Sequence, residues 1–196
     1  LNWAYEAPNR FIIEDDYDSE FRFDGRPLDT LFSMDNNERV IYLNTFTKSI
    51  SPSLRISYMV LPENLVQEFR NKLGFYSCTV SSIEQLTLAS FISGGWFEKH
   101  LIRMKNYYKN LRNLLINELN KSPLKSIMTI TEKDAGLHFL MQIDSDMNDA
   151  DISKILYDNK IKISFLSEYF YNTNTNNGTM VINYSGLKKN QITQLV

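Results

Sequence analysis

Four side chains in the first third of the chain have the chemical types needed to hold pyridoxal phosphate. A lysine amine can form a Schiff base with the aldehyde of that cofactor, and a carboxylate can keep its pyridine nitrogen protonated. A phenol can donate a hydrogen bond to the ring oxygen, and a planar guanidinium group can bind the phosphate. In chain order these residues are Asp15, Tyr17, Lys48 and Arg55. We therefore predict a pyridoxal-phosphate site built from these four residues, with Lys48 as the catalytic lysine.

The four residues stand next to short apolar runs that predict strands of an α/β sheet. These runs, rich in β-branched and aromatic residues, are Phe11–Ile13, Val40–Phe46 and Ile56–Leu61. Asp15 follows the first run and Lys48 follows the second, and ligands of α/β sheets bind at the carboxyl ends of strands. Tyr17 is two positions after Asp15, so on an extended chain both side chains leave on the same face. The pattern favours a joint role at one end of a sheet.

Each of these residues also has an ordinary interpretation. Asp15 could cap a turn at a strand end, and Tyr17 could be a half-buried strand aromatic. Lys48 could be a solvated loop lysine, and Arg55 could be a surface residue near the start of a strand. Against this, Lys48 follows an apolar strand among hydroxyl side chains that suit a phosphate, namely Thr45, Thr47, Ser49 and Ser51.

Two strings of sequence resemble the aminotransferase-like region of MocR/GabR-type transcription regulators. The first is Glu-Asp-Asp-Tyr-Asp-Ser-Glu-Phe-Arg at residues 14–22, and the second runs from Tyr42 to Tyr58 and contains Lys48 and Arg55. The first string is the more discriminating, because ordinary class I aminotransferases usually carry one more residue between the aspartate and the tyrosine. The resemblance favours a regulator of this type over a free-standing enzyme.

The resemblance implies a fold and a domain organisation. Regulators of this type are similar to fold-type I aminotransferases and carry an N-terminal winged helix of the GntR type. The expected class is α/β, with part of the large domain of a fold-type I pyridoxal-phosphate-dependent transferase followed by a smaller α+β C-terminal domain. Residues 1–80 would be the C-terminal half of the large cofactor-binding domain, 81–120 a long connecting helical region, and 121–196 the small domain. The chain opens with Leu1 and not with methionine, so we expect a fragment without the winged helix.

On this interpretation the chain is an effector-sensing domain that binds pyridoxal phosphate through Lys48. The effector would be a small amine, an amino acid or the cofactor itself. The resemblance also implies a homodimer, which would bind DNA only through the absent N-terminal domain. Two alternatives stay open. One is a working class I/II aminotransferase, in which Lys48 also moves a proton between ligand and cofactor. The other is a degenerate dimerisation domain that binds no cofactor.

Three residues depart from the pattern of these regulators. Asn44 and Ser57 occupy positions where the family commonly has glycine. Glu168 lies in a segment where GabR-like members place an arginine for the carboxylate of the ligand. A carboxylate at that place repels another carboxylate. Glu168 could instead attract an amine or be an exposed residue without a role in binding, or the effector could be the cofactor itself.

Composition restricts the remaining classes of function. Across 196 residues, 43% are apolar and 13% aromatic, enough for real cores, and the net charge is −2. Without a Lys/Arg-rich stripe, this segment alone is not expected to bind DNA. No apolar stretch approaches the ~20 residues that span a bilayer. A single cysteine, Cys78, excludes an internal disulfide and agrees with a cytoplasmic protein, and His100 and His138 lack metal-ligand spacing, so no metal site is expected.

The rest of the chain predicts helices and a second sheet. A helix is expected from Pro62 to about Lys72, and a longer helical region from Ser82 to about Asn120, interrupted at Gly94-Gly95. In the longer region Leu101, Met104, Tyr108, Leu111 and Leu115 form an apolar stripe, with Lys105, Lys109 and Arg112 off it. The expected strands are residues 126–131, 136–143, 160–165 and 179–184, and the expected helices are residues 149–158 and 188–196. Residues 172–178 predict a mobile polar loop.

Overall fold

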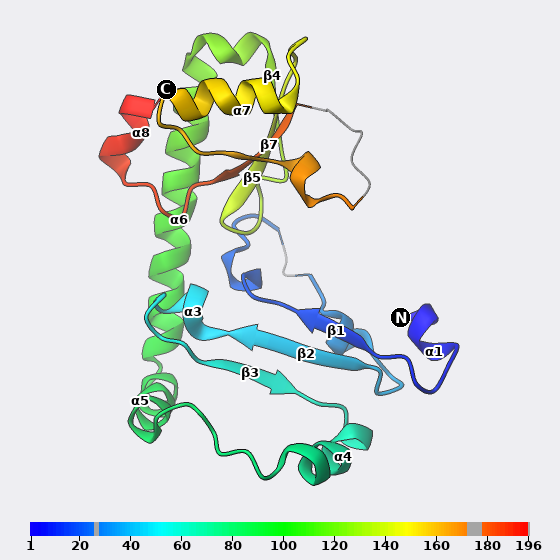
Figure 1. The fold of residues 1–196 in the computed structure, drawn as a ribbon. Coiled ribbons are helices and arrows are strands. Elements are labelled where there is room, and N and C mark those ends of the chain that lie inside the picture. Colours follow the sequence, from blue (N-terminus) through cyan, green and yellow to red (C-terminus); the bar gives the residue numbers. More distant parts are fainter. Residues whose placement is uncertain (26–27, 172–177, 196) are drawn as a thin grey trace. The chain divides into compact units, whose positions relative to one another are not determined.

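The structure, a computed structural model, describes residues 1–25, 28–171 and 178–195 (Figure 1). The chain forms two compact units. The first consists of Leu1–Glu20 and Arg26–Met104, and the second of Phe21–Gly25 and Lys105–Val196. A segment of five residues near the start of the chain therefore belongs to the C-terminal unit. The assignment of a cofactor-binding half, a connecting region and a small domain to residues 1–80, 81–120 and 121–196 concerns the role of each segment and stays a prediction.

The first unit is built on a three-stranded sheet. Its strands are β1 (Ile12–Asp15), β2 (Val40–Thr45) and β3 (Ser57–Val60), so all three predicted strands are present. β1 pairs in parallel with β2, and β2 pairs antiparallel with β3. The carboxyl ends of β1 and β2 and the amino end of β3 therefore meet at one edge, as the arrowheads in Figure 1 show.

The helices of the first unit include several that the sequence patterns did not indicate. They are α1 (Asn2–Tyr5), η1 (Ser19–Phe21), whose last residue belongs to the second unit, α2 (Leu31–Met34), α3 (Phe46–Ser49), α4 (Glu63–Leu73) and α5 (Ser82–Ser93). α2 and α3 are single turns, too short for a periodic pattern. Their side-chain caps stabilise them, because the hydroxyls of Thr30 and Thr45 accept hydrogen bonds from backbone amides of the first turn.

The second unit is built on a four-stranded antiparallel sheet. It has the order β4 (Met128–Thr131), β5 (His138–Ile143), β7 (Thr179–Asn183) and β6 (Ser164–Phe165). The helical elements of this part of the chain are α6 (Trp96–Lys121), η2 (Pro123–Ser126), α7 (Asp149–Asp158), η3 (Leu166–Tyr169) and α8 (Lys189–Leu195). α6 contributes its first residues to the first unit and the remainder to the second.

The strand predicted for residues 160–165 is much shorter than expected. Lys160 adopts a positive φ of 63°, and the amide of Ile161 donates a hydrogen bond to the carbonyl oxygen of Leu156. These residues terminate α7 and do not pair with a strand. Only Ser164 and Phe165 remain for β6.

The core of the second unit lies between the sheet and α6. Leu111, Leu115 and Leu119 of α6 are buried, and so are Phe139 and Tyr184 from the sheet side. Arg112, which was expected to lie off the apolar stripe, is nevertheless buried, with only 5% of the residue exposed. Its guanidinium group reaches a carbonyl and a carboxylate, which compensate for the burial of the charge.

Expectations from the sequence also concerned membrane-spanning helices, metal sites and a polar loop. Within the described ranges, no helix is long and apolar enough to cross a membrane. The same ranges hold no group of three or more His, Cys, Asp or Glu side chains that could bind a metal ion. The polar loop predicted at residues 172–178 lies outside the described residues, except for Gly178.

Candidate functional site

Three of the four predicted site residues are attached to the same edge of the first sheet. Asp15 is the last residue of β1, where its Cα partner is Leu43 of β2. Lys48 lies in α3, the single turn that directly follows β2. Arg55 precedes the amino end of β3, which is antiparallel to β2 and therefore begins at this edge. Tyr17 follows Asp15 by two residues and has an exposed fraction of 42%.

The three consecutive acids Glu14, Asp15 and Asp16, at the carboxyl end of β1, have different environments. The Glu14 carboxylate accepts hydrogen bonds from the amides of Leu31 (2.8 Å) and Phe32 (2.9 Å), so it holds the start of α2. The Asp16 carboxylate accepts a hydrogen bond of 2.7 Å from the hydroxyl of Tyr42. Asp15 is exposed, and its carboxylate has no hydrogen-bond or ion-pair partner among the described residues. The turn-capping interpretation therefore applies to Glu14 and not to Asp15.

The backbone that carries Lys48 is tied to the segment that carries Arg55. The hydroxyl of Thr45 lies 3.1 Å from the carbonyl oxygen of Ile56, which also accepts the amide of Phe46 at 2.9 Å. The hydroxyl of Thr47 donates to the carbonyl oxygen of Leu54 at 3.0 Å. These contacts fix the β2–α3 turn against the residues before β3. The hydroxyls of Thr45 and Thr47, two of the four that the sequence suggested for binding a phosphate, therefore already have partners within the protein.

The ends of the Lys48 and Arg55 side chains are available to a ligand. Both residues are exposed, and within the part of the chain that the structure describes neither makes a hydrogen bond or an ion pair. One edge of the sheet therefore carries an amine, a guanidinium and a carboxylate, with a phenol close by in the chain. This donor set fits the aldehyde, the phosphate, the pyridine nitrogen and the ring oxygen of pyridoxal phosphate.

A polar cluster that sequence reasoning missed is formed by residues of β2 and β3 together with Glu20 of η1. Asn44, one of the departures from the family pattern, is 6% exposed, and its Nδ2 donates to the hydroxyl of Tyr42 at 2.9 Å. Burial raises the pKa of Glu20, while a hydrogen bond from Asn44 opposes this shift. Burial also raises the pKa of Tyr58, and the nearby charge of Glu20 adds to the increase. The signal available in the sequence was Asn44 itself, a polar residue inside an apolar strand.

Glu168, the other departure, has a local structural contact. Its Oε1 accepts a hydrogen bond of 2.9 Å from the amide of Phe165, at the start of η3. The segment around it is held by the buried carboxylate of Asp149, which accepts the hydroxyl of Ser167 (2.6 Å) and the amide of Gly178 (3.1 Å). Glu168 is exposed and belongs to the second unit, whereas Asp15 and Lys48 belong to the first.

The sequence of the chain is similar to those of bacterial transcription regulators. It is 38% identical to the helix-turn-helix-type transcriptional regulator YhdI of Bacillus subtilis over 192 residues, which cover 98% of this chain and 40% of that protein. The probable rhizopine catabolism regulatory protein MocR of Rhizobium meliloti is 34% identical over 93% of this chain and 36% of its own length. The pyridoxine biosynthesis regulator PdxR of Corynebacterium glutamicum is 28% identical over 90% of this chain and 37% of its own length. The chain thus spans about two fifths of the length of these regulators.

The fold is that of an aminotransferase. The kynurenine aminotransferase of Pyrococcus horikoshii matches with a TM-score of 0.82 at 23% identity, over 98% of this chain and 47% of that one. A multiple-substrate aminotransferase from Thermococcus profundus gives a TM-score of 0.82 at 22% identity, over 99% of this chain and 47% of the other. No family model matches the sequence. The predicted α/β fold is confirmed, and the similarities in sequence and in fold agree with the aminotransferase-like region of MocR-type regulators of transcription.

Proposed function

We propose that this chain is the cofactor-holding part of an effector-sensing domain in a transcription regulator, and that its cofactor is pyridoxal phosphate. The observation that carries the proposal is that Asp15, Lys48 and Arg55 lie on one edge of the first sheet and that their side chains have no partner among the described residues. Charged side chains without partners, held by a well-bonded backbone, are what a preformed ligand site requires.

Each residue has a distinct proposed task. Asp15 would accept a hydrogen bond from the pyridine nitrogen and keep it protonated, and Tyr17 would donate one to the ring oxygen. Arg55 would bind the phosphate with its planar fork. Lys48 would hold the aldehyde covalently through its amine. The cofactor, when bound, supplies a carbonyl group that exchanges reversibly between primary amines, which suits it to report an amine ligand.

Sensing is favoured over turnover by the pattern of similarity. Regulators resemble this chain at up to 38% identity over nearly all of it, whereas the aminotransferases named above share its fold at 22 to 23% identity. Fold alone does not establish function. A working aminotransferase is the second candidate, supported by that fold and by the presence of a lysine at position 48. A cofactor-free dimerisation domain is the third, and the same four residues argue against it.

The remaining parts of the proposal concern the complete protein. DNA would be bound by a helix-turn-helix domain outside this chain, as the names of YhdI and PdxR suggest. The protein would work in the cytoplasm as a homodimer. The effector would be an amine, an amino acid or the cofactor itself; PdxR, named as a regulator of pyridoxine biosynthesis, supports the last. A change of ligand would shift the population of domain arrangements and hence the affinity for DNA.

The test uses full-length protein in three assays. Pyridoxal phosphate is titrated into wild type and into Lys48→Ala, and the visible band of lysine-bound cofactor is followed. Binding to operator DNA is then measured with and without the cofactor, and transamination is measured with a panel of amino acids. A sensor gives a Lys48-dependent band, cofactor-dependent DNA affinity and no turnover. Multiple turnovers support the enzyme instead, and absence of the band supports the cofactor-free domain.

A further inference from the structure

The five residues Phe21–Gly25, which we call the strap, connect the candidate site to the second unit. By their contacts they belong to the C-terminal unit, although the residues immediately before them belong to the first. Only Asp18, Ser19 and Glu20 separate Tyr17 from the strap. A segment this short can span little more than about 13 Å even when fully extended, so the position of the strap restricts the position of Tyr17.

The strap is bonded to the second unit along its backbone. The amide of Phe23 donates to the carbonyl oxygen of Asp134 at 2.9 Å, and the amide of Gly136 donates to the carbonyl oxygen of Phe21 at 3.1 Å. The strap residue between these two bonds takes part in an isolated antiparallel bridge. The strap is therefore joined to the turn before β5 by one isolated β-bridge, with a backbone hydrogen bond on each side of it.

Two aromatic side chains of the strap are embedded in the second unit. Phe21 is fully buried, and its ring meets that of Tyr108 edge to face, with 5.3 Å between the ring centroids. Phe23 is also buried, and the guanidinium carbon of Arg112 lies 4.8 Å from its ring centroid. Both partners lie on α6. Burial of two aromatic side chains makes withdrawal of the strap costly.

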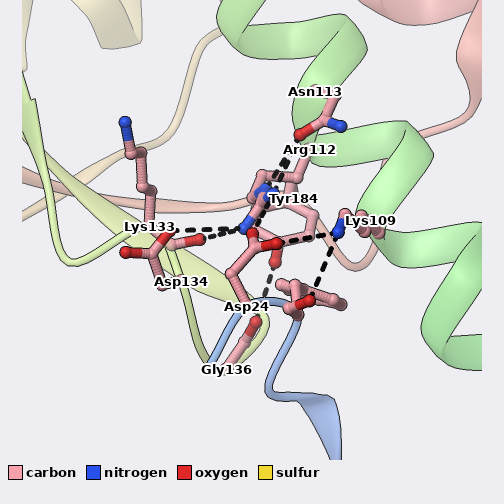
Figure 2. Close-up of polar contacts among 9 residues, drawn as sticks. Asp24, Lys109, Arg112, Asn113, Lys133, Asp134, Gly136 and Tyr184 are labelled. Atoms are coloured by element: carbon pink, nitrogen blue, oxygen red, sulfur yellow. Dashed lines mark hydrogen bonds and ion pairs between the residues drawn. The ribbon is translucent and has the colours of Figure 1, made fainter. Parts of the chain in front are cut away.

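Ionic contacts complete the attachment (Figure 2). Asp24 lies between two cations of α6: one of its carboxylate oxygens is 2.8 Å from Nζ of Lys109 and the other is 3.2 Å from the guanidinium of Arg112. Arg112 also donates to the carbonyl oxygen of Lys133 at 2.5 Å, and Lys109 donates to that of Phe23 at 3.3 Å. Hydrogen bonds from Lys109 and Arg112 lower the pKa of Asp24, which stays charged at neutral pH.

On the other side of Tyr17 the chain is held by the first sheet. The amide of Asp16 donates to the carbonyl oxygen of Leu43 at 2.9 Å, and the carboxylate of Asp16 accepts the hydroxyl of Tyr42. At this crossing of the chain, residues 17–20 lie between a segment bonded to the first sheet and a strap that belongs to the second unit. Displacements between units of a protein are absorbed by a few residues at the ends of elements.

We propose that Asp24 and Arg112 are positioning residues for Tyr17: they fasten the strap, and through it they couple the phenol at the cofactor ring to the position of the C-terminal unit. The inference rests on the proposed function, because it requires a cofactor beside Tyr17. It assigns a positioning task to an ion-pair cluster whose members are not among the proposed cofactor-binding residues.

The experiment measures the pH midpoint of the visible band in full-length protein loaded with pyridoxal phosphate. A hydrogen bond donated by Tyr17 to the ring oxygen favours the form of the cofactor with fewer protons, so loss of that bond raises the midpoint. Asp24→Ala is expected to raise the midpoint by about half a pH unit. Asp24→Glu, which keeps a carboxylate, should restore most of the wild-type value. Lys121→Met, which removes the exposed ion pair of Lys121 with Glu118 on the same helix, is the matched control and should leave the midpoint unchanged.

A double mutant tests whether the effect passes through Tyr17. In a Tyr17→Phe background, Asp24→Ala should no longer change the midpoint, because the phenol is already absent. Amide hydrogen exchange in the same variants should become faster at residues 17–20 as well as at residues 21–25. A merely stabilising strap would lower the thermal midpoint of Asp24→Ala without either effect.

The outcomes separate the two proposals. If wild type shows the band and Asp24→Ala has the same pH midpoint as wild type, the positioning role is overturned and the cofactor proposal stands. The same holds if Asp24→Ala shifts the midpoint equally in the wild-type and Tyr17→Phe backgrounds. Faster exchange confined to residues 21–25 also overturns the positioning role. A wild-type protein without the band refutes the proposed function, and the inference falls with it.

Discussion

The hydroxyl of Tyr42 donates a hydrogen bond of 2.7 Å to Asp16, whereas the neighbouring Asp15 has no partner among the residues that the structure describes. Successive residues of a strand point to opposite faces, so one carboxylate of the doubled aspartate contacts the protein and the other faces solvent. The same alternation gives Glu14 its two backbone amides at the start of α2. Alternation along the strand thus separates the two acids with structural contacts, Glu14 and Asp16, from Asp15, the acid proposed to bind the ligand.

Asp15→Asn should weaken cofactor binding without destabilising the protein. Hydrogen bonds to charged groups contribute about 1.5–3 kcal/mol, so the affinity for pyridoxal phosphate should fall about 10- to 100-fold. The free energy of unfolding should stay within about 0.5 kcal/mol of wild type, because Asp15 is exposed. Equilibrium titration and urea unfolding of full-length protein measure the two quantities. An unchanged affinity would remove Asp15 from the site.

Glu14→Gln is the matched change one residue before Asp15. It should lower the stability of the protein and leave cofactor affinity nearly unchanged, the reverse of what Asp15→Asn should do. It weakens the two bonds to the amides of Leu31 and Phe32, with a loss of about 1–2 kcal/mol of stability. Cofactor affinity should remain within about threefold of wild type once the protein is folded. If Glu14→Gln weakened binding as much as Asp15→Asn, the separation of roles along β1 would be wrong.

Glu20 should make the protein less stable as pH rises. Burial raises its pKa above the ordinary value of 4.5, so the folded state holds the proton more tightly than the unfolded state. This contribution to stability is present below pH 4.5 and is lost as pH rises through the folded pKa. Glu20→Gln cannot lose a proton, so its urea midpoint relative to wild type should increase between pH 4.5 and pH 7.5. A difference that is constant with pH would contradict the burial of this carboxylate.

The buried carboxylate of Asp149 should contribute more to the stability of the second unit than the exposed carboxylate of Asp151. Asp149→Ala removes the acceptor for Ser167 and Gly178 at a buried position and should cost about 1–3 kcal/mol. Thermal unfolding of full-length protein measures this loss. Asp151→Ala on the same helix turn, which affects an exposed residue, is the comparison. Equal losses in the two variants would show that the buried contacts of Asp149 are unimportant.

Two substitutions of Glu168 separate its capping contact from its charge. Glu168→Gln keeps an oxygen acceptor for the amide of Phe165 and should match wild type in stability. Glu168→Ala loses the acceptor and should lower the free energy of unfolding by about 1 kcal/mol. If Gln and Ala variants were equally destabilised, the charge and not the capping contact would be the stabilising feature.

Local sequence patterns predicted the strands and helices in which apolar side chains recur at a regular spacing. The runs at Val40 and Ile56 became β2 and β3, and the helix expected at 149–158 has those bounds in the structure. The single turns α2 and α3 were not predicted, because each depends on one capping residue and on contacts distant in sequence. The short β6 has a related cause, since Lys160 in the left-handed region ends α7 and displaces the strand.

The candidate site was predictable in composition but not in environment. Residue types and spacing indicated Asp15 and Lys48, whereas the partner of Asp16 lies on the neighbouring strand and those of Glu14 lie at the start of α2. The burial of Arg112 could not be predicted from periodicity, because it requires Asp24, a residue 88 positions away. Contacts between side chains so far apart in the sequence form only when the chain folds.

Covalent labelling tests the central claim most directly. Full-length protein is incubated with pyridoxal phosphate, reduced with borohydride and digested, and the labelled peptide is identified by mass spectrometry. Lys72→Ala, which changes an exposed lysine of α4, should be labelled as wild type is, and Lys48→Ala should not be labelled. We predict a single labelled lysine, Lys48. A label on another lysine, or no label at all, would contradict the assignment of this edge of the sheet as the cofactor site.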